Sequence, residues 1–370
     1  MSDLPPAQQR RIAALRACER ILSEGRPVTM RERLAALSTA DGLDAPPDFY
    51  GGNGPVRQLE ERVAGLLGTE NCVFFPTGTM AQQVALRYGA QLTGRDAVAL
   101  HPLSHLERHE RYAYSQLTGL RAIWPGSAAR QPSAAELAEL GEPFGTLTVE
   151  LPLRDAGFVL PSWDELVELS AAARAAGARV HFDGARIWDT TVHFDRPLDE
   201  IAGLADSTYV SFYKTLGGIS GAALAGTNEL AAYARTWRHR YGGNLYQQWP
   251  AALSALIGLD TELPRVPGYV RHARVVAGAL AALPGARVNP LPPHTHRFQL
   301  WLPHPAEALN HAALTLAEEQ RVWFVDRWQN TAAPNQSMTE VTVAGAALDW
   351  TAPEVTDAAE HFLYLARRAE

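Results

Sequence analysis

The chain has 370 residues, of which 46% are hydrophobic and 20% charged, and its formal net charge at pH 7 is −7. This composition is typical of a globular protein with a large buried core. The acidic balance, with no dense run of Lys and Arg to reverse it locally, argues against a nucleic-acid surface and favours a small-molecule partner.

Short apolar runs alternate with segments of helical apolar spacing after residue 50, whereas residues 1–50 show weak strand signals and are expected to form a helical N-terminal arm. Strands separated by helices imply βαβ units, so residues 51–260 are expected to form a large α/β domain around a mainly parallel sheet. The predicted strands are 72–76, 97–101, 120–124, 145–152, 179–183 and 207–212, and the predicted helices are 79–92, 104–117, 133–140 and 162–177.

A Pro- and Gly-containing stretch at residues 259–270 is expected to connect the large domain to a small α+β domain over residues 261–370. The small domain is expected to combine a helix at 270–283, strands at 297–303, 321–325 and 338–345, and a final amphipathic helix at 352–370.

Targeting and redox signals are sparse. Cys18 and Cys72 are too few for a disulfide framework and lie in no Cys/His cluster, so we expect no metal. The first residues lack the apolar core of a signal peptide, and no apolar run reaches the roughly 18 residues of a membrane span. We expect a cytoplasmic protein with no membrane partner.

An aspartate and a lysine follow two of the predicted strands. Asp183 ends "RVHFD", where carboxyl ends of parallel strands form a ligand crevice. Taken alone, Asp183 could equally cap a helix or pair with Arg186 at the surface. Lys214, in "SFYKTLGG", lies among apolar residues and glycines, a setting that lowers the pKa of an amine and suits it to Schiff-base chemistry. Together the two side chains fit pyridoxal phosphate, with the carboxylate at the ring nitrogen and the amine on the aldehyde carbon.

A phosphate site is expected where "FFPTGTMAQQVAL" passes from a strand into a helix. Gly78, Thr79 and Met80 would place free backbone N–H groups and the positive end of a helix dipole at one point. Such a turn is commonplace by itself, so its weight comes from the order of Gly78, Asp183 and Lys214 along the chain.

The segments "YGGNGPV", "FFPTGTMAQQVAL", "VHFDGARIWD", "SFYKTLGGISGAALAG" and "HRYGGNLYQQWPAAL" together resemble the threonine aldolase and β-eliminating lyase family of pyridoxal-phosphate enzymes. The resemblance covers most of residues 50–260. It implies the aspartate-aminotransferase fold (fold type I), with a small C-terminal domain and a homodimer or homotetramer that shares its active sites. The implied activity is cleavage of the Cα–Cβ bond of a β-hydroxy-α-amino acid to glycine and an aldehyde.

The resemblance also implies a role for each matching residue. Lys214 would bond to the cofactor, Asp183 would face its ring nitrogen, and Arg186 would lie beside its phenolic oxygen and the substrate carboxylate. His105 would stack on the ring and serve in proton transfer, although "HLERHE" could also be a solvated helix face. The further matches are Gly78, Thr79, Met80 and Ser211 at the phosphate, and Tyr50 and Ser23 near the substrate, the last two being equally compatible with packing and capping.

Three positions depart from the family pattern. Leu153 stands where a histidine near the substrate hydroxyl is expected, with Arg154 beside it as a candidate carboxylate or phosphate contact. Tyr246 replaces an arginine. Glu340 lies where a carboxylate-binding arginine is expected, unless Arg297 or Arg327 takes that role. These changes leave open β-elimination, racemisation or transamination with the same cofactor, and a non-catalytic chain with this fold.

Overall fold

The computed structural model describes residues 5–369. They form two compact units, one from Leu34 to Pro264 and the other combining the segment up to Arg33 with the segment from Arg265 on. Residues up to Arg33 therefore pack with the C-terminal segment. The predicted division into an arm and two domains at residues 50 and 260 stays a prediction. No helix within residues 5–369 is both long and apolar enough to cross a membrane.

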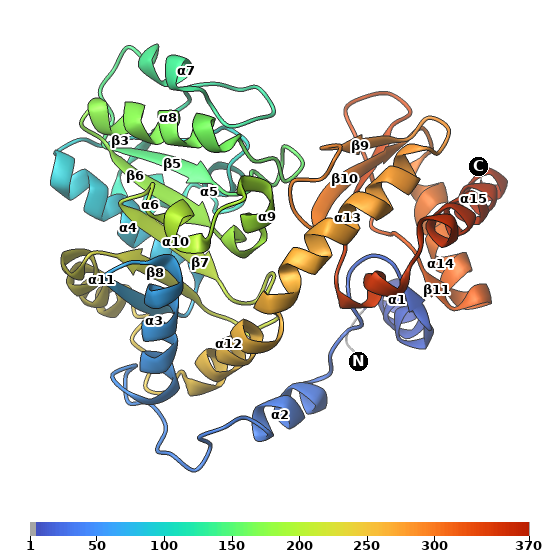
Figure 1. Ribbon diagram of the computed structural model, residues 1–370, viewed down its shortest axis with the longest axis horizontal. Helices are drawn as coiled ribbons and strands as arrows, with labels where there is room; N and C mark the ends of the chain where they lie inside the picture. Colours follow the sequence, from blue (N-terminus) through green and yellow to red (C-terminus); the bar gives the residue numbers. More distant parts are fainter. Residues whose placement is uncertain (1–4, 370) are drawn as a thin grey trace. The chain divides into compact units, whose positions relative to one another are not determined.

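A seven-stranded sheet organises the larger unit (Figure 1). Its order is β2-β8-β7-β6-β5-β3-β4, in which β8 is antiparallel to both neighbours and the other pairings are parallel. The predicted strands are all present, but β8 was not predicted because a run of Ala and Gly carries little strand signal. The bounds are β2 Asn71–Phe75, β3 Ala97–Ala99, β4 Arg121–Ile123, β5 Thr146–Glu150, β6 Arg179–Gly184, β7 Ser207–Ser211 and β8 Ala222–Gly226.

Helices cover both faces of this sheet, as the alternation of strands and helices predicts. α3, α8, α10 and α12 contribute to one hydrophobic core, whereas α4, α6 and α11 contribute to the clusters on the other face. The helices of this unit are α3 Gly54–Leu67, α4 Gly78–Thr93, α5 His105–Arg108, α6 Ala113–Thr118, α7 Ala134–Ala138, α8 Trp163–Ala175, α9 Thr191–Phe194, α10 Leu198–Ala202, α11 Asn228–Arg240 and α12 Trp249–Thr261, and α2 Met30–Ser38 precedes them.

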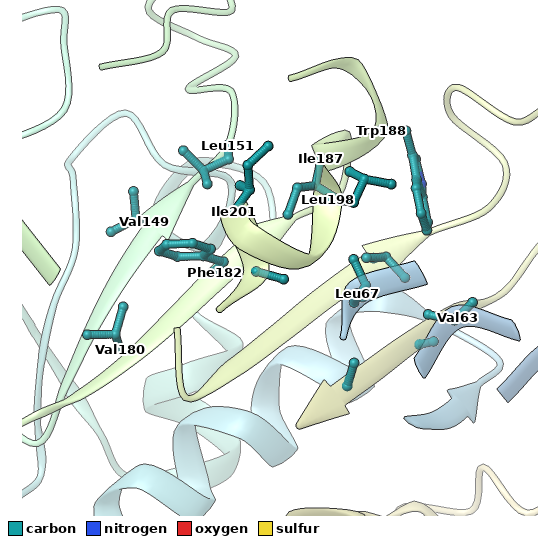
Figure 2. Close-up of a cluster of buried hydrophobic side chains, with 14 of the residues drawn as sticks. Val63, Leu67, Val149, Leu151, Val180, Phe182, Ile187, Trp188, Leu198 and Ile201 are labelled. Atoms are coloured by element: carbon teal, nitrogen blue, oxygen red, sulfur yellow. The ribbon is translucent and has the colours of Figure 1, made fainter. Parts of the chain in front are cut away.

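The core against β5 and β6 fixes the sheet edge that carries the predicted site. Figure 2 shows Val149 and Phe182 of these strands below Leu198 and Ile201 of α10. Phe182 is fully buried, and burying a side chain of this size contributes roughly 1.5–3 kcal/mol. The ends of β5 and β6 are therefore held in register by apolar packing directly beneath them.

The stretch 104–117, predicted as one helix, forms two short helices instead. Arg111 and Tyr112 adopt positive φ values of 51° and 58°, a conformation that cannot continue a right-handed helix. The break leaves His105 in the first turn of α5 and Glu110 in the turn that follows, so the polar residues of this stretch lie on a bend rather than along one helix face.

Two further sheets organise the smaller unit. An antiparallel sheet has the order β12-β13-β10-β9, and β1 pairs in parallel with β11. The predicted connector is helical, because Pro267 is tolerated in the first turn of α13, and α14 was not predicted. The bounds are α1 Pro6–Ala17, β1 Arg20–Ile21, α13 Val266–Ala281, β9 Arg287–Asn289, β10 Arg297–Leu302, α14 Ala306–Gln320, β11 Val322–Trp323, β12 Gln329–Asn330, β13 Ser337–Thr342 and α15 Ala352–Ala369.

Candidate active site

Three polar side chains lie at the carboxyl ends of β5, β6 and β7. Asp183 and Ser211 were predicted site residues, and Glu150 was not. Glu150 of β5 pairs in register with Asp183 of β6, and Ser211 ends β7. Asp183 is only 1% exposed, and its Oδ1 accepts a hydrogen bond from Ala185 N at 3.2 Å. The Ser211 hydroxyl donates to Ala185 O at 3.2 Å, which fixes the turn after Asp183.

Glu150 was not predicted as a site residue, yet it is the most perturbed carboxyl at this edge. Burial, then the neighbouring Asp183 carboxylate, raise the pKa of Glu150 to about 7. Its Oε2 accepts from His105 N at 2.7 Å and its Oε1 from Arg154 N at 3.3 Å. Glu150 therefore ties the start of α5 to the end of β5.

His105 lies between several charged groups. Its Nδ1 is 3.4 Å from Glu110 Oε1, and Gln83 Nε2 donates to the other oxygen of the buried Glu110 at 3.3 Å. Burial alone would lower the pKa of His105, but the Glu110 hydrogen bond and the charge of Asp183 outweigh it and raise the pKa, against an opposing contribution from Lys214. His105, Asp183 and Lys214 therefore lie close enough for their charges to interact.

Lys214 and Arg186 lie on the loops that follow β7 and β6. Lys214 is flanked by the buried side chains of Phe212 and Leu216, and its Nζ is 5.9 Å from the centre of the Tyr213 ring. Arg186 Cζ lies 5.5 Å from the Phe158 ring. Burial raises the pKa of Tyr213, which also senses the charges of Arg186 and Asp183. Tyr213 on one loop and Arg186 on the other therefore lie close enough to interact.

The predicted phosphate turn opens α4 at the carboxyl end of β2. Thr77 caps this 16-residue helix by accepting a hydrogen bond from Met80 N at 3.4 Å. A Cβ on Gly78 would lie 2.2 Å from the Tyr209 hydroxyl, so a residue without a side chain is required there. The N–H groups of Gly78 and Thr79 in the first turn remain available to an anion.

These features test whether the residues fit pyridoxal phosphate. The cofactor needs a carboxylate for its ring nitrogen, an amine for its aldehyde carbon and donors for its phosphate. Asp183 supplies the first, Lys214 the second and the start of α4 the third, where Gly78 allows the Tyr209 hydroxyl to pack against the turn. The residues present fit the cofactor.

The structure gives the following surroundings for Tyr50, Arg154 and Ser23. Tyr50 is 44% exposed and has its ring edge-on to Phe49 and Tyr246, at 4.9 and 5.5 Å between ring centres. Arg154 contacts the site through its backbone N–H. Ser23 belongs to the smaller unit, where its buried hydroxyl accepts a hydrogen bond from Thr342 N at 3.0 Å.

The anionic-anchor candidates of the C-terminal segment also belong to the smaller unit. Glu340 on β13 pairs in register with Gln299 on β10, and Arg297 begins β10. Arg327 Nη1 is 3.5 Å from Glu24 Oε1, so this arginine already has an acidic partner.

Comparison with known proteins gives a consistent result. The beta-eliminating lyase family model matches residues 27–300. Low-specificity L-threonine aldolase 1 of Arabidopsis thaliana is 25% identical over 270 residues, which is 70% of this chain and 74% of that protein. Low specificity L-threonine aldolase of Escherichia coli K12 is 29% identical over 256 residues, 64% of this chain and 71% of that protein.

Solved structures match over nearly the whole chain. A putative L-allo-threonine aldolase of Listeria monocytogenes is 29% identical, with 98% of this chain and 99% of that chain covered and a TM-score of 0.89. A putative aromatic amino acid beta-eliminating lyase/threonine aldolase of Exiguobacterium sp. 255-15 is 32% identical, with coverage of 98% and 100% and a TM-score of 0.89. SPT solved with PLP, 17% identical with a TM-score of 0.67 over 91% and 84% of the two chains, shares the fold.

Proposed function

Because the chain belongs to the beta-eliminating lyase family, we propose that it is a pyridoxal-phosphate-dependent lyase that cleaves the Cα–Cβ bond of threonine and related β-hydroxy-α-amino acids to glycine and an aldehyde. The observation that carries this proposal is the meeting of Asp183, Lys214 and the start of α4 at one sheet edge in a chain similar to threonine aldolases. The family match and the similar structures confirm the predicted fold, family and cofactor class.

In the proposed reaction, Asp183, Lys214, Arg186 and His105 have different roles. The bound cofactor withdraws electrons from the substrate's Cα. Asp183 would keep a proton on the ring nitrogen, Lys214 would hold the aldehyde carbon, and the Lys214 amine would move a proton at the substrate's Cα. Arg186 pairs with the substrate carboxylate. His105 contacts Glu110 through Nδ1 and Glu150 through its backbone N–H, and its imidazole would stack on the ring.

The test is incubation of the purified chain, loaded with pyridoxal phosphate, with L-threonine, L-allo-threonine and phenylserine. We expect glycine and the matching aldehyde in equal amounts. Lys214→Ala should lose both the products and the yellow absorbance of the lysine-bound cofactor. No aldehyde from any of the three substrates would overturn the proposal.

β-Elimination is the second candidate, because the name of the Exiguobacterium structure includes both activities. It uses the same residues, but Lys214 removes the α-proton and a β-substituent leaves. Keto acid and ammonia without aldehyde, from serine or an aromatic amino acid, would favour it over aldol cleavage.

We also propose a cytoplasmic homodimer or homotetramer that shares its active sites. The support is an exposed aromatic cluster made of Phe49, Tyr50 and Tyr246, which are 58%, 44% and 57% exposed. Aromatic rings exposed together are typical of surfaces that another chain covers. Light scattering on the loaded chain measures the assembly, and a monomer at micromolar concentration would contradict it.

A further inference from the structure

The proposed cleavage needs a group that accepts the proton of the substrate's β-hydroxyl. The loop after β5 carries Leu153 at the position where the family resemblance leads us to expect a histidine. Leu153 is fully buried and packs with Ala156, Val159 and Leu103, and its N–H donates to Val159 O at 3.0 Å. This side chain serves the packing of the loop and cannot accept a proton.

The same loop presents a carboxylate to a second imidazole. Asp155 Oδ2 and Oδ1 lie 2.9 and 3.1 Å from His109 Nε2, and the Asp155 side chain is 19% exposed. Arg108 Nε is 4.0 Å from the same carboxylate. The contact joins the turn after α5 to the loop after β5, two segments that both begin at the sheet edge of the candidate active site.

His109 is also adjacent to the residue that we place on the cofactor ring. The centres of the His105 and His109 rings are 5.3 Å apart, with an angle of 42° between their planes, and His109 N donates to His105 O at 2.9 Å. His105 in turn senses the charges of Asp183 and Lys214. His109 is thus one imidazole further from the cofactor residues, and its side chain is 38% exposed, so small molecules in solution can contact it.

The two histidines differ in the groups that contact their ring nitrogens. Glu110 and Asp183 together raise the pKa of His105 despite its burial, which favours a ring that already carries its second proton. His109 contacts the Asp155 carboxylate through Nε2, and this contact does not involve Nδ1. A proton on Nε2, accepted by Asp155, leaves the lone pair on Nδ1, the arrangement by which a carboxylate orients an imidazole base.

We propose that His109, oriented by Asp155, is the general base for the substrate's β-hydroxyl in this chain. His109 Nδ1 takes the hydroxyl proton, and the O–H electron pair becomes the second bond of the aldehyde carbonyl. The Cα–Cβ bond breaks, its electron pair stays with the glycine half, and a proton from solvent completes glycine. The assignment rests on the proposed function, because only a β-hydroxy substrate offers this proton.

The experiment compares two reactions of the loaded chain. Cleavage of phenylserine needs the β-hydroxyl base, whereas exchange of the glycine α-hydrogen with deuterated water needs the cofactor residues but no such base. In His109→Phe we expect kcat for cleavage to fall about 100-fold or more, while the exchange rate changes less than about threefold. Asp155→Asn should lower cleavage in the same direction by a smaller factor. His311→Phe, an exposed histidine on α14, is the matched control and should leave both rates unchanged.

A second measurement does not depend on activity. The ¹⁵N NMR shifts of the His109 ring in the cofactor-free chain, followed over a pH range that includes its neutral form, should show that this form carries its proton on Nε2, and Asp155→Asn should remove this preference. A neutral ring that carries its proton on Nδ1 would overturn the assignment. So would cleavage that is unchanged in His109→Phe, or cleavage and exchange that fall together. A wild-type chain that forms no aldehyde would overturn the proposed function itself, a result distinct from these three.

Discussion

Two buried glutamates, Glu60 on α3 beside β2 and Glu150 at the end of β5, have neighbours of opposite charge. The difference shows how neighbouring charges distinguish a structural carboxylate from one at the candidate active site. Glu60 of α3 is 7% exposed and Glu150 of β5 is 5% exposed, and burial raises the pKa of both. Glu60 lies beside two cations: its Oε2 is 3.2 Å from Arg235 Nη2 and its Oε1 is 3.7 Å from Arg238 Nη1. Glu150 instead lies beside the like charge of Asp183.

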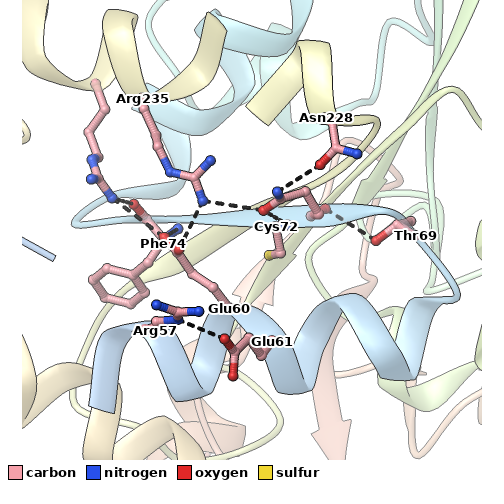
Figure 3. Close-up of polar contacts among 10 residues, drawn as sticks. Arg57, Glu60, Glu61, Thr69, Cys72, Phe74, Asn228 and Arg235 are labelled. Carbon is pink, nitrogen blue, oxygen red and sulfur yellow. Dashed lines mark hydrogen bonds and ion pairs between the residues drawn. The ribbon is translucent and has the colours of Figure 1, made fainter. Parts of the chain in front are cut away.

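The surroundings of Glu60 explain its role. β2 is an edge strand, and Figure 3 shows Glu60 against Phe74 of that strand. Phe74 N donates to Glu60 Oε1 at 2.8 Å, while Arg238 Nη1 donates to Phe74 O at 2.7 Å. The ion pair thereby satisfies the backbone groups that a further strand would pair with. Glu60 is thus paired with two arginines, whereas Glu150 lies next to the Asp183 carboxylate that would face the cofactor's ring nitrogen.

Removing the charge of Asp183, the neighbour of Glu150, should have the largest effect on activity. We expect Asp183→Asn to lower the cleavage rate of the loaded chain by about 100-fold or more, because the cofactor nitrogen loses its carboxylate. The free energy of unfolding of the cofactor-free chain should stay the same or rise, since repulsion with Glu150 is relieved. Aldehyde release and urea unfolding measure the two effects. A loss of stability as large as that of a core mutation would place Asp183 in the scaffold instead.

Removing Glu60, beside the edge strand β2, should lower the stability of the chain. Glu60→Ala leaves Arg238 buried without its carboxylate and Phe74 N–H without its acceptor, so we expect the free energy of unfolding to fall by about 3 kcal/mol. Glu61→Ala is the control, because Glu61 and its partner Arg57 are 64% and 68% exposed, and a loss below about 0.5 kcal/mol is expected. Equal losses in the two variants, followed by urea unfolding, would refute the distinction.

The raised pKa of Glu150 predicts how the stability of the chain depends on pH. A pKa raised from 4.5 to about 7 means that folded Glu150 binds a proton that the unfolded chain releases. The free energy of unfolding of the cofactor-free chain therefore falls as pH rises through this window, by about 2–3 kcal/mol. Glu150→Gln should flatten that slope between pH 5 and 7 in urea titrations. A slope identical to that of the wild type would show that Glu150 is ionised in both states.

The smallest expected effect concerns the partner of His105. Glu110→Gln removes a carboxylate from Nδ1 while the amide can still contact Gln83, so the pKa of His105 should fall. NMR titration of the His105 ring follows this directly. Glu107→Gln serves as the control, because this half-buried carboxylate of α5 accepts its hydrogen bond from Tyr114 OH, at 2.7 Å. An unchanged pKa of His105 in Glu110→Gln would mean that Asp183 alone raises it.

Much of the fold could be predicted because its strands are short, apolar and separated by amphipathic helices. The errors have local causes: Ala- and Gly-rich β8 carries little strand signal, and positive φ at Arg111 and Tyr112 divides a predicted helix. The helical connector was missed because Pro and Gly also signal loops. α14 was missed although its Ala-rich sequence favours a helix. The roles of the predicted site residues stay predictions that the experiments above test.

The sequence by itself determined the cofactor class and the residues that follow each strand, because parallel strands carry their ligands at their carboxyl ends whatever the exact packing. It could not identify the partners of those residues. Glu150 meets His105 across 45 positions and Asp155 meets His109 across 46, and both contacts exist only because β3 and β6 flank β5. Strand order and loop packing are set by the whole core, so the tertiary structure alone decided which carboxylate faces which imidazole.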